Sequence, residues 1–201
     1  MSFSKPASRF LPWTFLLVLG VACATQGAYD YNREPDPRSV EFPIGPGDHL
    51  KINVWRDQEL TTEVRVRPDG AITVPLVGDV RAAGRTSSQI RDEIQQKLAA
   101  FMKSETAKVT VIVAEVRSYY FTVSGNVERP GLYRASSYVT VLEAVAMAGE
   151  PNRYADPDRL TLLRKDRGYT KRIPIDYETL RKGQRMEQNI VVLAGDNIVV
   201  P

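Results

Sequence analysis

Apolar and polar residues alternate over short stretches in the first half of the chain, a pattern typical of half-buried β-strands. Leu50, Ile52 and Val54 are separated by polar residues, which predicts one strand. Residues 109–116 alternate as well and are rich in β-branched side chains, so a second strand is expected there.

A turn is predicted directly before the first of these strands. Gly45, Pro46, Gly47 and Asp48 lie together, and glycine takes positive φ, proline fixes φ, and an aspartate side chain accepts hydrogen bonds from backbone amides. We interpret these four residues as shaping the backbone, not as ligands or acids.

A second turn is predicted at Pro68, Asp69 and Gly70. Residues 63–67 alternate before it, and residues 72–77 form a nearly continuous apolar run after it. Two such segments on either side of a Pro-Asp-Gly turn predict an antiparallel hairpin.

Two segments carry the start signal and the periodicity of amphipathic helices. Thr86 and Gln89 form a capping box, and a helix over residues 87–102 is expected to bury Ile90, Ile94, Leu98 and Phe101. Thr140 and Glu143 repeat the capping box before a shorter apolar face, and Gly149 is expected to end that helix.

Strands are predicted on both sides of this second helix, at residues 119–124, 160–164, 169–175, 189–193 and 197–200. Gly125 is expected in a bulge or turn, and Pro130 and Gly131 in a hairpin turn. Gly195 and Asp196 repeat the Gly-Asp pair found before the first strand, and two ordinary turns are favoured over an internal repeat. Strands surrounding one helix fit a β-grasp, and the fold class is α+β.

The order of motifs in residues 44–86 resembles a known family. A Gly-Pro-Gly-Asp turn, a Pro-Asp-Gly turn and a Pro-Leu-x-Gly stretch also open the polysaccharide export domain of bacterial outer-membrane polysaccharide export proteins. Residues 123–149 resemble the soluble-ligand-binding β-grasp (SLBB) module that follows in that family. We therefore expect a signal peptide at 1–23, a tether at 24–43 that is extended and mobile, an export domain at 44–117 and an SLBB domain at 118–201.

The N-terminus has the pattern of an export signal, because Lys5 and Arg9 precede an apolar run at residues 10–22. As a helix this run would extend about 20 Å, against about 30 Å of bilayer hydrocarbon, so a signal is favoured over a membrane span.

Cys23 directly follows the apolar run and allows two kinds of processing. The sequence Gly20-Val21-Ala22-Cys23 fits a lipoprotein box, in which the Cys23 thiol becomes lipidated, although glycine occupies the position where leucine is usual. The sequence Ala22-Cys23-Ala24 also fits an ordinary signal cleavage site. We favour lipidation because a lone cysteine at this place is otherwise a coincidence. Ala24 would then direct the protein to the outer membrane.

Composition and charge exclude several functions. The formal net charge of +3 falls to +1 once Lys5 and Arg9 leave with the signal, which removes the electrostatic basis for nucleic-acid binding. The chain has one cysteine, so redox chemistry is excluded, and a hydrophobic content of 43% suffices for one or two small globular domains.

Catalytic and metal-binding patterns are missing from the sequence. His49 is the only histidine and is interpreted as exposed in a turn. Asp156 and Asp158 resemble the start of a calcium loop, but Pro157 between them favours a solvated loop. We assign no catalytic residue, metal ligand or cofactor. Packing is favoured over polysaccharide contact for the many tyrosines of the second half, and Trp55 is interpreted as a core residue.

The resemblance implies a non-enzymatic role. A family member of this kind would form a homo-oligomeric ring that conducts a capsular polysaccharide or exopolysaccharide polymer, in the periplasm or lipid-anchored on the periplasmic face of the outer membrane. We interpret the chain as a short form without a C-terminal membrane-spanning helix. It would therefore need a separate outer-membrane β-barrel, and its other partner would be an inner-membrane polysaccharide co-polymerase or tyrosine kinase. A monomeric periplasmic ligand-binding module is the alternative.

Overall fold

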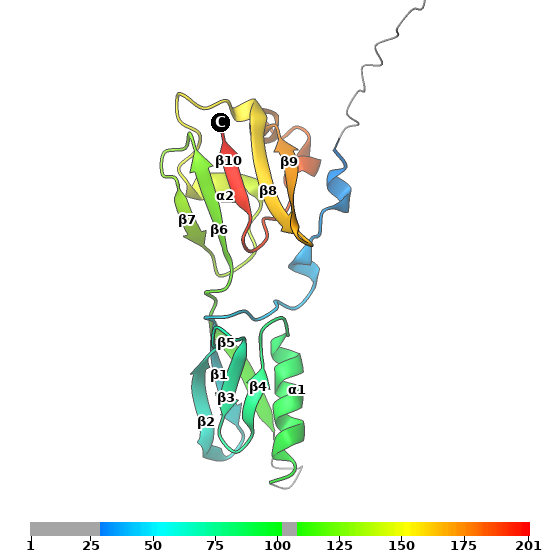
Figure 1. Cartoon of the computed structure of the whole chain (residues 1–201), viewed down its shortest axis with the longest axis vertical. Helices are drawn as coiled ribbons and strands as arrows, with labels where there is room; N and C mark the ends of the chain where they lie inside the picture. Colours follow the sequence, from blue (N-terminus) through cyan, green and yellow to red (C-terminus); the bar gives the residue numbers. More distant parts are fainter. Residues whose placement is uncertain (1–28, 102–107) are drawn as a thin grey trace, which may run out of the picture.

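The structure, a computed structural model, describes residues 29–101 and 108–201 and contains two domains stacked end to end (Figure 1). The signal peptide and Cys23 lie outside the described residues. A narrow waist joins the domains, and residues 29–43, drawn in blue, run beside the second domain before they enter the first. None of the helices in the described ranges is long and apolar enough to cross a bilayer.

The first domain combines a three-stranded antiparallel sheet, a two-stranded sheet and one helix. The strand order of the larger sheet is β2-β1-β5, and β3 pairs with β4. The elements are β1 (His49–Val54), β2 (Asp57–Arg65), β3 (Ala71–Val74), β4 (Gly78–Arg81), α1 (Ser87–Leu98) and β5 (Val109–Glu115). Alternate residues of β1 and one face of α1 supply a common core, as their periodicity predicts.

The predicted hairpin around Asp69 is wrong in its pairing. The turn forms, since the Gly70 N–H donates to the Arg67 carbonyl at 2.8 Å, but β2 pairs with β1 and β3 pairs with β4. Val66, just after β2, is held by the Gly-Asp turn: its carbonyl accepts the Gly47 N–H and its own N–H donates to the Asp48 carbonyl, both at 2.9 Å. Across the Asp69 turn, the Arg67 N–H donates to the Ala71 carbonyl at 2.9 Å, but the pairing does not extend into a β2–β3 ladder, and β3 is paired with β4 instead.

Two other expectations in this domain need correction. The α1 capping box between Thr86 and Gln89 is present, but the helix ends at Leu98, where tight turns take over. Phe101 is therefore 64% exposed and not part of the buried face. Trp55 is 61% exposed in the turn between β1 and β2, so it is not a core residue.

The second domain has the strand order β7-β6-β10-β8-β9, with β6 and β10 parallel and every other pair antiparallel. Its strands are β6 (Tyr120–Gly125), β7 (Gly131–Arg134), β8 (Leu160–Asp166), β9 (Tyr169–Ile175) and β10 (Asn197–Val200). Its helices are α2 (Val141–Met147), α3 (Tyr177–Arg181) and the short 3₁₀ turns η3 (Pro157–Arg159) and η4 (Met186–Gln188). This mixed sheet packed on α2 is a β-grasp, and the predicted α+β class is confirmed.

One predicted strand of this domain, at residues 189–193, is not formed. Val191 makes only an isolated bridge to Thr140. The Val192 N–H donates to the Val139 carbonyl at 2.9 Å, and the Asn189 side chain accepts the Leu142 N–H at 3.1 Å. This segment therefore closes the loop and the N-terminus of α2 instead of joining the sheet.

The segment expected to be an extended, mobile tether is docked over its described part. It contains η1 (Tyr31–Arg33) and η2 (Pro37–Ser39). Tyr31 lies in the core of the second domain and donates from its hydroxyl to the Pro174 carbonyl at 2.6 Å. Glu41 accepts hydrogen bonds at the N-terminus of α1, from Ser87 Oγ at 2.6 Å and the Ser88 N–H at 3.0 Å. The segment thus binds both domains.

Candidate functional site

The Gly-Pro-Gly-Asp turn builds the junction between the domains. Asp48 is fully buried, and its Oδ1 accepts the backbone N–H groups of Arg117 and Ser118, both at 2.7 Å. Its Oδ2 accepts the Gly45 N–H and the Ser118 hydroxyl, both at 2.8 Å. One carboxylate at the start of β1 therefore holds the connection from β5 to β6.

The neighbouring glycines are needed for this contact. A Cβ added to Gly45 would lie 2.4 Å from the Ser118 Cβ, so only glycine lets the two backbones approach this closely. Gly47 adopts φ +93°, a conformation that favours glycine. Pro46 lies between them and lines the surface at the waist.

A second Gly-Asp turn precedes β10 and has a similar geometry. Asp196 is buried, and its Oδ2 accepts the Leu193 N–H three residues earlier at 2.7 Å, as Asp48 does with Gly45. Asp196 also pairs with Arg164 at 2.7 Å. Burial raises the pKa of the Asp196 carboxyl, and Arg164 opposes that rise.

Arg164 joins Asp196 to the N-terminal segment. Its Nη1 contacts Glu34 Oε2 at 2.7 Å, and Lys171 pairs with the other oxygen of the same carboxylate. The Arg164 and Glu34 side chains are 6% and 2% exposed. The sequence analysis did not predict this network, although the sequence contains a sign of it. Arg164 occupies an inward-facing position of β8, after Leu160 and Leu162, and a buried charge needs a partner.

The other turn residues singled out in the sequence lie in separate places. A Cβ on Gly125 would lie 2.0 Å from the Val200 carbonyl oxygen, so this glycine permits the close approach of β10. Asp69 forms an exposed ion pair with Arg67, and a Cβ on Gly70 would lie 2.7 Å from the Ala83 Cβ. Pro130 and Gly131 are exposed at the start of β7. These residues support separate turns and do not converge on one site.

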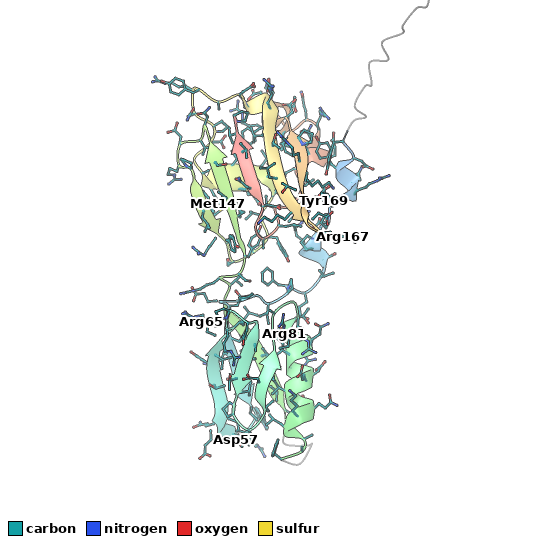
Figure 2. The ribbon with its side chains drawn as sticks, viewed as in Figure 1. Asp57, Arg65, Arg81, Met147, Arg167 and Tyr169 are labelled. Atoms are coloured by element: carbon teal, nitrogen blue, oxygen red, sulfur yellow. The ribbon has the colours of Figure 1, made fainter. Side chains whose placement is uncertain are left out.

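A groove of about 780 Å³ lies at the waist, between the two domains. The first domain contributes Arg65 and Glu115 and the connection contributes Arg117. The second domain contributes Tyr120 and Arg134. In Figure 2, Arg65 marks the end of the first domain that faces the second. This size is within the range of about 300–1,000 Å³ typical of ligand sites, which often occur between domains.

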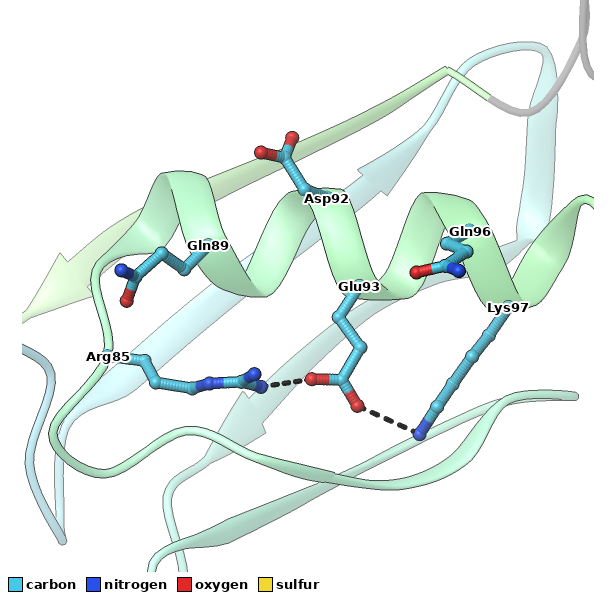
Figure 3. A pocket seen from close by; sticks show the side chains of 6 residues that line it. All are labelled: Arg85, Gln89, Asp92, Glu93, Gln96 and Lys97. Carbon is cyan, nitrogen blue, oxygen red and sulfur yellow. Dashed lines mark hydrogen bonds and ion pairs between the residues drawn. The ribbon is translucent and has the colours of Figure 1, made fainter.

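A second hollow follows the exposed face of α1 and is lined by Arg85, Gln89, Asp92, Glu93, Gln96 and Lys97 (Figure 3). Glu93 pairs with Arg85 and, at 2.9 Å, with Lys97. The Arg85 hydrogen bond and then that of Lys97 lower the pKa of Glu93. Because both cations are bound to this carboxylate, the face is a surface ion network without a free reactive group.

The described residues contain no group of three or more histidine, cysteine, aspartate or glutamate side chains placed to hold a metal ion. His49 is half-buried in β1 and accepts the Arg65 Nε–H at 2.8 Å. Tyr119 and Tyr177 lie in the core, whereas Tyr120, Tyr154 and Tyr169 are exposed. The waist groove is therefore the place where exposed aromatic and charged groups from both domains meet.

Two family models match the chain, one after the other along the sequence. Residues 36–114 match the family model of polysaccharide biosynthesis/export proteins, and residues 120–176 match that of the SLBB domain.

Two curated relatives align with most of the chain. The exopolysaccharide production protein ExoF of Rhizobium meliloti (strain 1021) is 32% identical over 159 residues, which cover 74% of this chain and 36% of ExoF. The EPS I polysaccharide export outer membrane protein EpsA of Ralstonia nicotianae is 28% identical over 187 residues, 81% of this chain and 47% of EpsA. The chain thus spans less than half the length of these relatives.

Proposed function

Because the chain belongs to the polysaccharide biosynthesis/export family and carries an SLBB domain behind its export domain, we propose that it is a component of a machinery that exports a capsular polysaccharide or exopolysaccharide. The observation that carries this proposal is the pair of family domains in one chain, joined by the buried carboxylate of Asp48. The names of ExoF and EpsA refer to the production and the export of such polymers.

The role we propose is conduction of the polymer by a ring of subunits, without bond cleavage. A closed ring needs each subunit to present its two interfaces at a fixed angle, and the Asp48 contacts restrict the angle between the domains. Strands β2 and β7 are at sheet edges, so their outer backbone groups are available to a neighbouring subunit, whereas edge strand β9 already binds the N-terminal segment through the Pro174 carbonyl.

The proposed location is the periplasmic face of the outer membrane, with Cys23 as the lipid attachment site. The proposed neighbours are an inner-membrane polysaccharide co-polymerase or tyrosine kinase and a separate outer-membrane barrel protein. The described segment from Tyr29 to Glu41 would then connect the anchor to both domains at once.

Deletion of the gene tests the proposal. We expect surface polymer to be lost and polymer to accumulate in the periplasm, and a plasmid copy of the wild-type gene to restore export. Normal surface polymer in a deletion strain that has no second copy of the family would overturn the proposal.

A monomeric ligand-binding module is the second candidate, and the waist groove is the observation that favours it. Mass measurement by light scattering distinguishes the two. A strict monomer at high concentration, with the lipid retained, would support the module and count against the ring.

A further inference from the structure

The waist groove combines positive charge from both domains. Arg65, Arg117 and Arg134 line it together with one carboxylate, Glu115. The Arg117 hydrogen bond at 2.8 Å keeps the pKa of Glu115 below its usual range, so this carboxylate is ionised and already paired. The three guanidinium groups and the one carboxylate therefore give the groove a net charge of +2.

Strand register explains why these side chains share one surface. In the first domain, His49 is opposite Arg65 on one side and Glu115 on the other, so these three residues form a row across the sheet. In the second domain, Tyr120 is opposite Arg134, and the neighbouring Phe121 points into the core. Each row lies at the end of its sheet that faces the waist.

Two guanidinium groups of the groove have capacity for a ligand. The Arg134 guanidinium makes no hydrogen bond or ion pair with any residue in the described ranges, and the Arg65 guanidinium uses only its Nε–H, toward His49. A guanidinium presents a planar pair of N–H groups that matches a carboxylate in a bidentate arrangement. Opposite Arg134 in the ladder, Tyr120 is 41% exposed, and its ring can offer an apolar face to a sugar.

On this basis we propose that the waist groove binds a carboxylate-bearing saccharide, with Arg134 and Arg65 on the carboxylate and the Tyr120 ring against the sugar. The inference rests on the proposed function, because it assigns the class of polymer that the export component contacts. A polymer bound there would touch both domains and would be sensitive to the angle that Asp48 sets.

Binding of oligosaccharides to the purified full-length protein tests this assignment. Titration calorimetry with a galacturonic acid tetramer is compared with a neutral glucose tetramer, and free galacturonic acid separates recognition of a chain from recognition of a lone carboxylate. We expect binding of the acidic tetramer, at least about tenfold weaker binding of the monomer and the neutral tetramer, and a decrease of affinity with salt.

Arg134→Gln is the main variant, because it breaks no hydrogen bond or ion pair among the described residues. It is expected to weaken binding of the acidic tetramer about tenfold or more. Arg167→Gln is the matched control, since Arg167 is exposed in the turn between β8 and β9, at the edge of the sheet opposite β7 and Arg134. It removes the same charge and is expected to leave the affinity unchanged. Tyr120→Leu keeps every charge, and it is expected to weaken binding of the acidic tetramer more than binding of the monomer.

Three results would overturn the assignment: no binding of the acidic tetramer at millimolar concentration, equal losses in Arg134→Gln and Arg167→Gln, or equally tight binding of a single-stranded DNA of the same charge. The deletion experiment remains a separate test of export. Failure of the groove to bind while the deletion strain loses surface polymer would reject this inference and leave the proposed function intact.

Discussion

Asp48 Oδ1 accepts the backbone N–H of Ser118 at 2.7 Å, so a side chain before the first strand determines how the chain enters the second domain. The carboxylate is fully buried. If it were removed, no water could take its place as the acceptor for the N–H and O–H groups that donate to it. The turn motif thus has an interdomain role that its local sequence pattern does not reveal.

We expect Asp48→Ala to lower the free energy of unfolding by about 3 kcal/mol or more, since it leaves several buried donors unpaired. Urea unfolding measures this change, and small-angle scattering should show a wider range of domain orientations. Asp69→Ala is the control, because this carboxylate is 56% exposed and paired at the surface, and its loss should cost no more than about 1 kcal/mol. Equal losses in the two variants would contradict the interdomain role of Asp48.

Gly45→Ala should destabilise the junction by steric conflict alone, because no positive φ is involved. A loss of about 1–3 kcal/mol is expected from overpacking against Ser118. Gly131→Ala is the matched control, since open space surrounds that position and its φ is also ordinary.

The double variant Gly45→Ala with Ser118→Gly should lose less stability than the sum of the two single variants, because it removes the Cβ that clashes, although Ser118→Gly also removes the hydroxyl that donates to Asp48. The difference would appear as a coupling energy in a double-mutant cycle measured by thermal unfolding. Additive losses would mean that the close approach to Ser118 is not the cause.

Docking of the N-terminal segment should weaken in acid. Burial alone would raise the pKa of Glu34, but hydrogen bonds from Lys171 and Tyr29 bring it below its usual value, and the Ser87 hydroxyl helps to lower the pKa of Glu41 to about 2. A carboxyl whose pKa is lower in the docked state stabilises docking fully above its free pKa of about 4.3, and the contribution is lost as the pH falls through the docked value.

Amide NMR signals of residues 31–34 should therefore change on titration from pH 5 to about pH 2. Glu34→Gln should show weaker docking at neutral pH and a smaller acid transition. An unchanged titration in this variant would exclude Glu34 as the titrating group.

Arg164→Ala should be among the most damaging substitutions in the second domain. It leaves the buried carboxylates of Glu34 and Asp196 without their shared cation, for which a loss of about 3–5 kcal/mol is typical. Arg172→Ala, at an exposed position of the neighbouring strand, should change stability by less than about 0.5 kcal/mol. Thermal unfolding of both variants measures the difference.

Cys23→Ser should release the protein from membranes if the thiol carries the lipid. Fractionation of cells, together with labelling by radioactive palmitate, checks this outcome. Unlabelled wild-type protein, or continued membrane association of the variant, would favour cleavage before Ala24 or retention by a partner.

Local signals in the sequence predicted local structure well. The capping boxes at Thr86 and Thr140 mark the true starts of α1 and α2, and alternation located β1 and β5, because these features depend on neighbours within a few residues. Pairing between strands could not be predicted in the same way: the Asp69 turn closes between Arg67 and Ala71, but β2 pairs with β1 and β3 pairs with β4, which the local pattern does not specify.

The candidate groove could not be found from the sequence, for a related reason. Arg65, Arg117 and Arg134 are far apart in the chain, and only strand register and the junction at Asp48 bring them to one surface. Trp55 shows the opposite error, since its apolar character suggested burial but its position in a turn exposes it.

The central position of β10 has a consequence for the order of folding. Residues 197–200 lie between β6 and β8, so the β-grasp sheet stays divided until its final strand is available. The first domain, by contrast, has all its strands by residue 115. Because the chain is synthesised from its N-terminus, it can complete the first domain early. The second domain must wait for contacts between residues far apart in the sequence, which are slow to form.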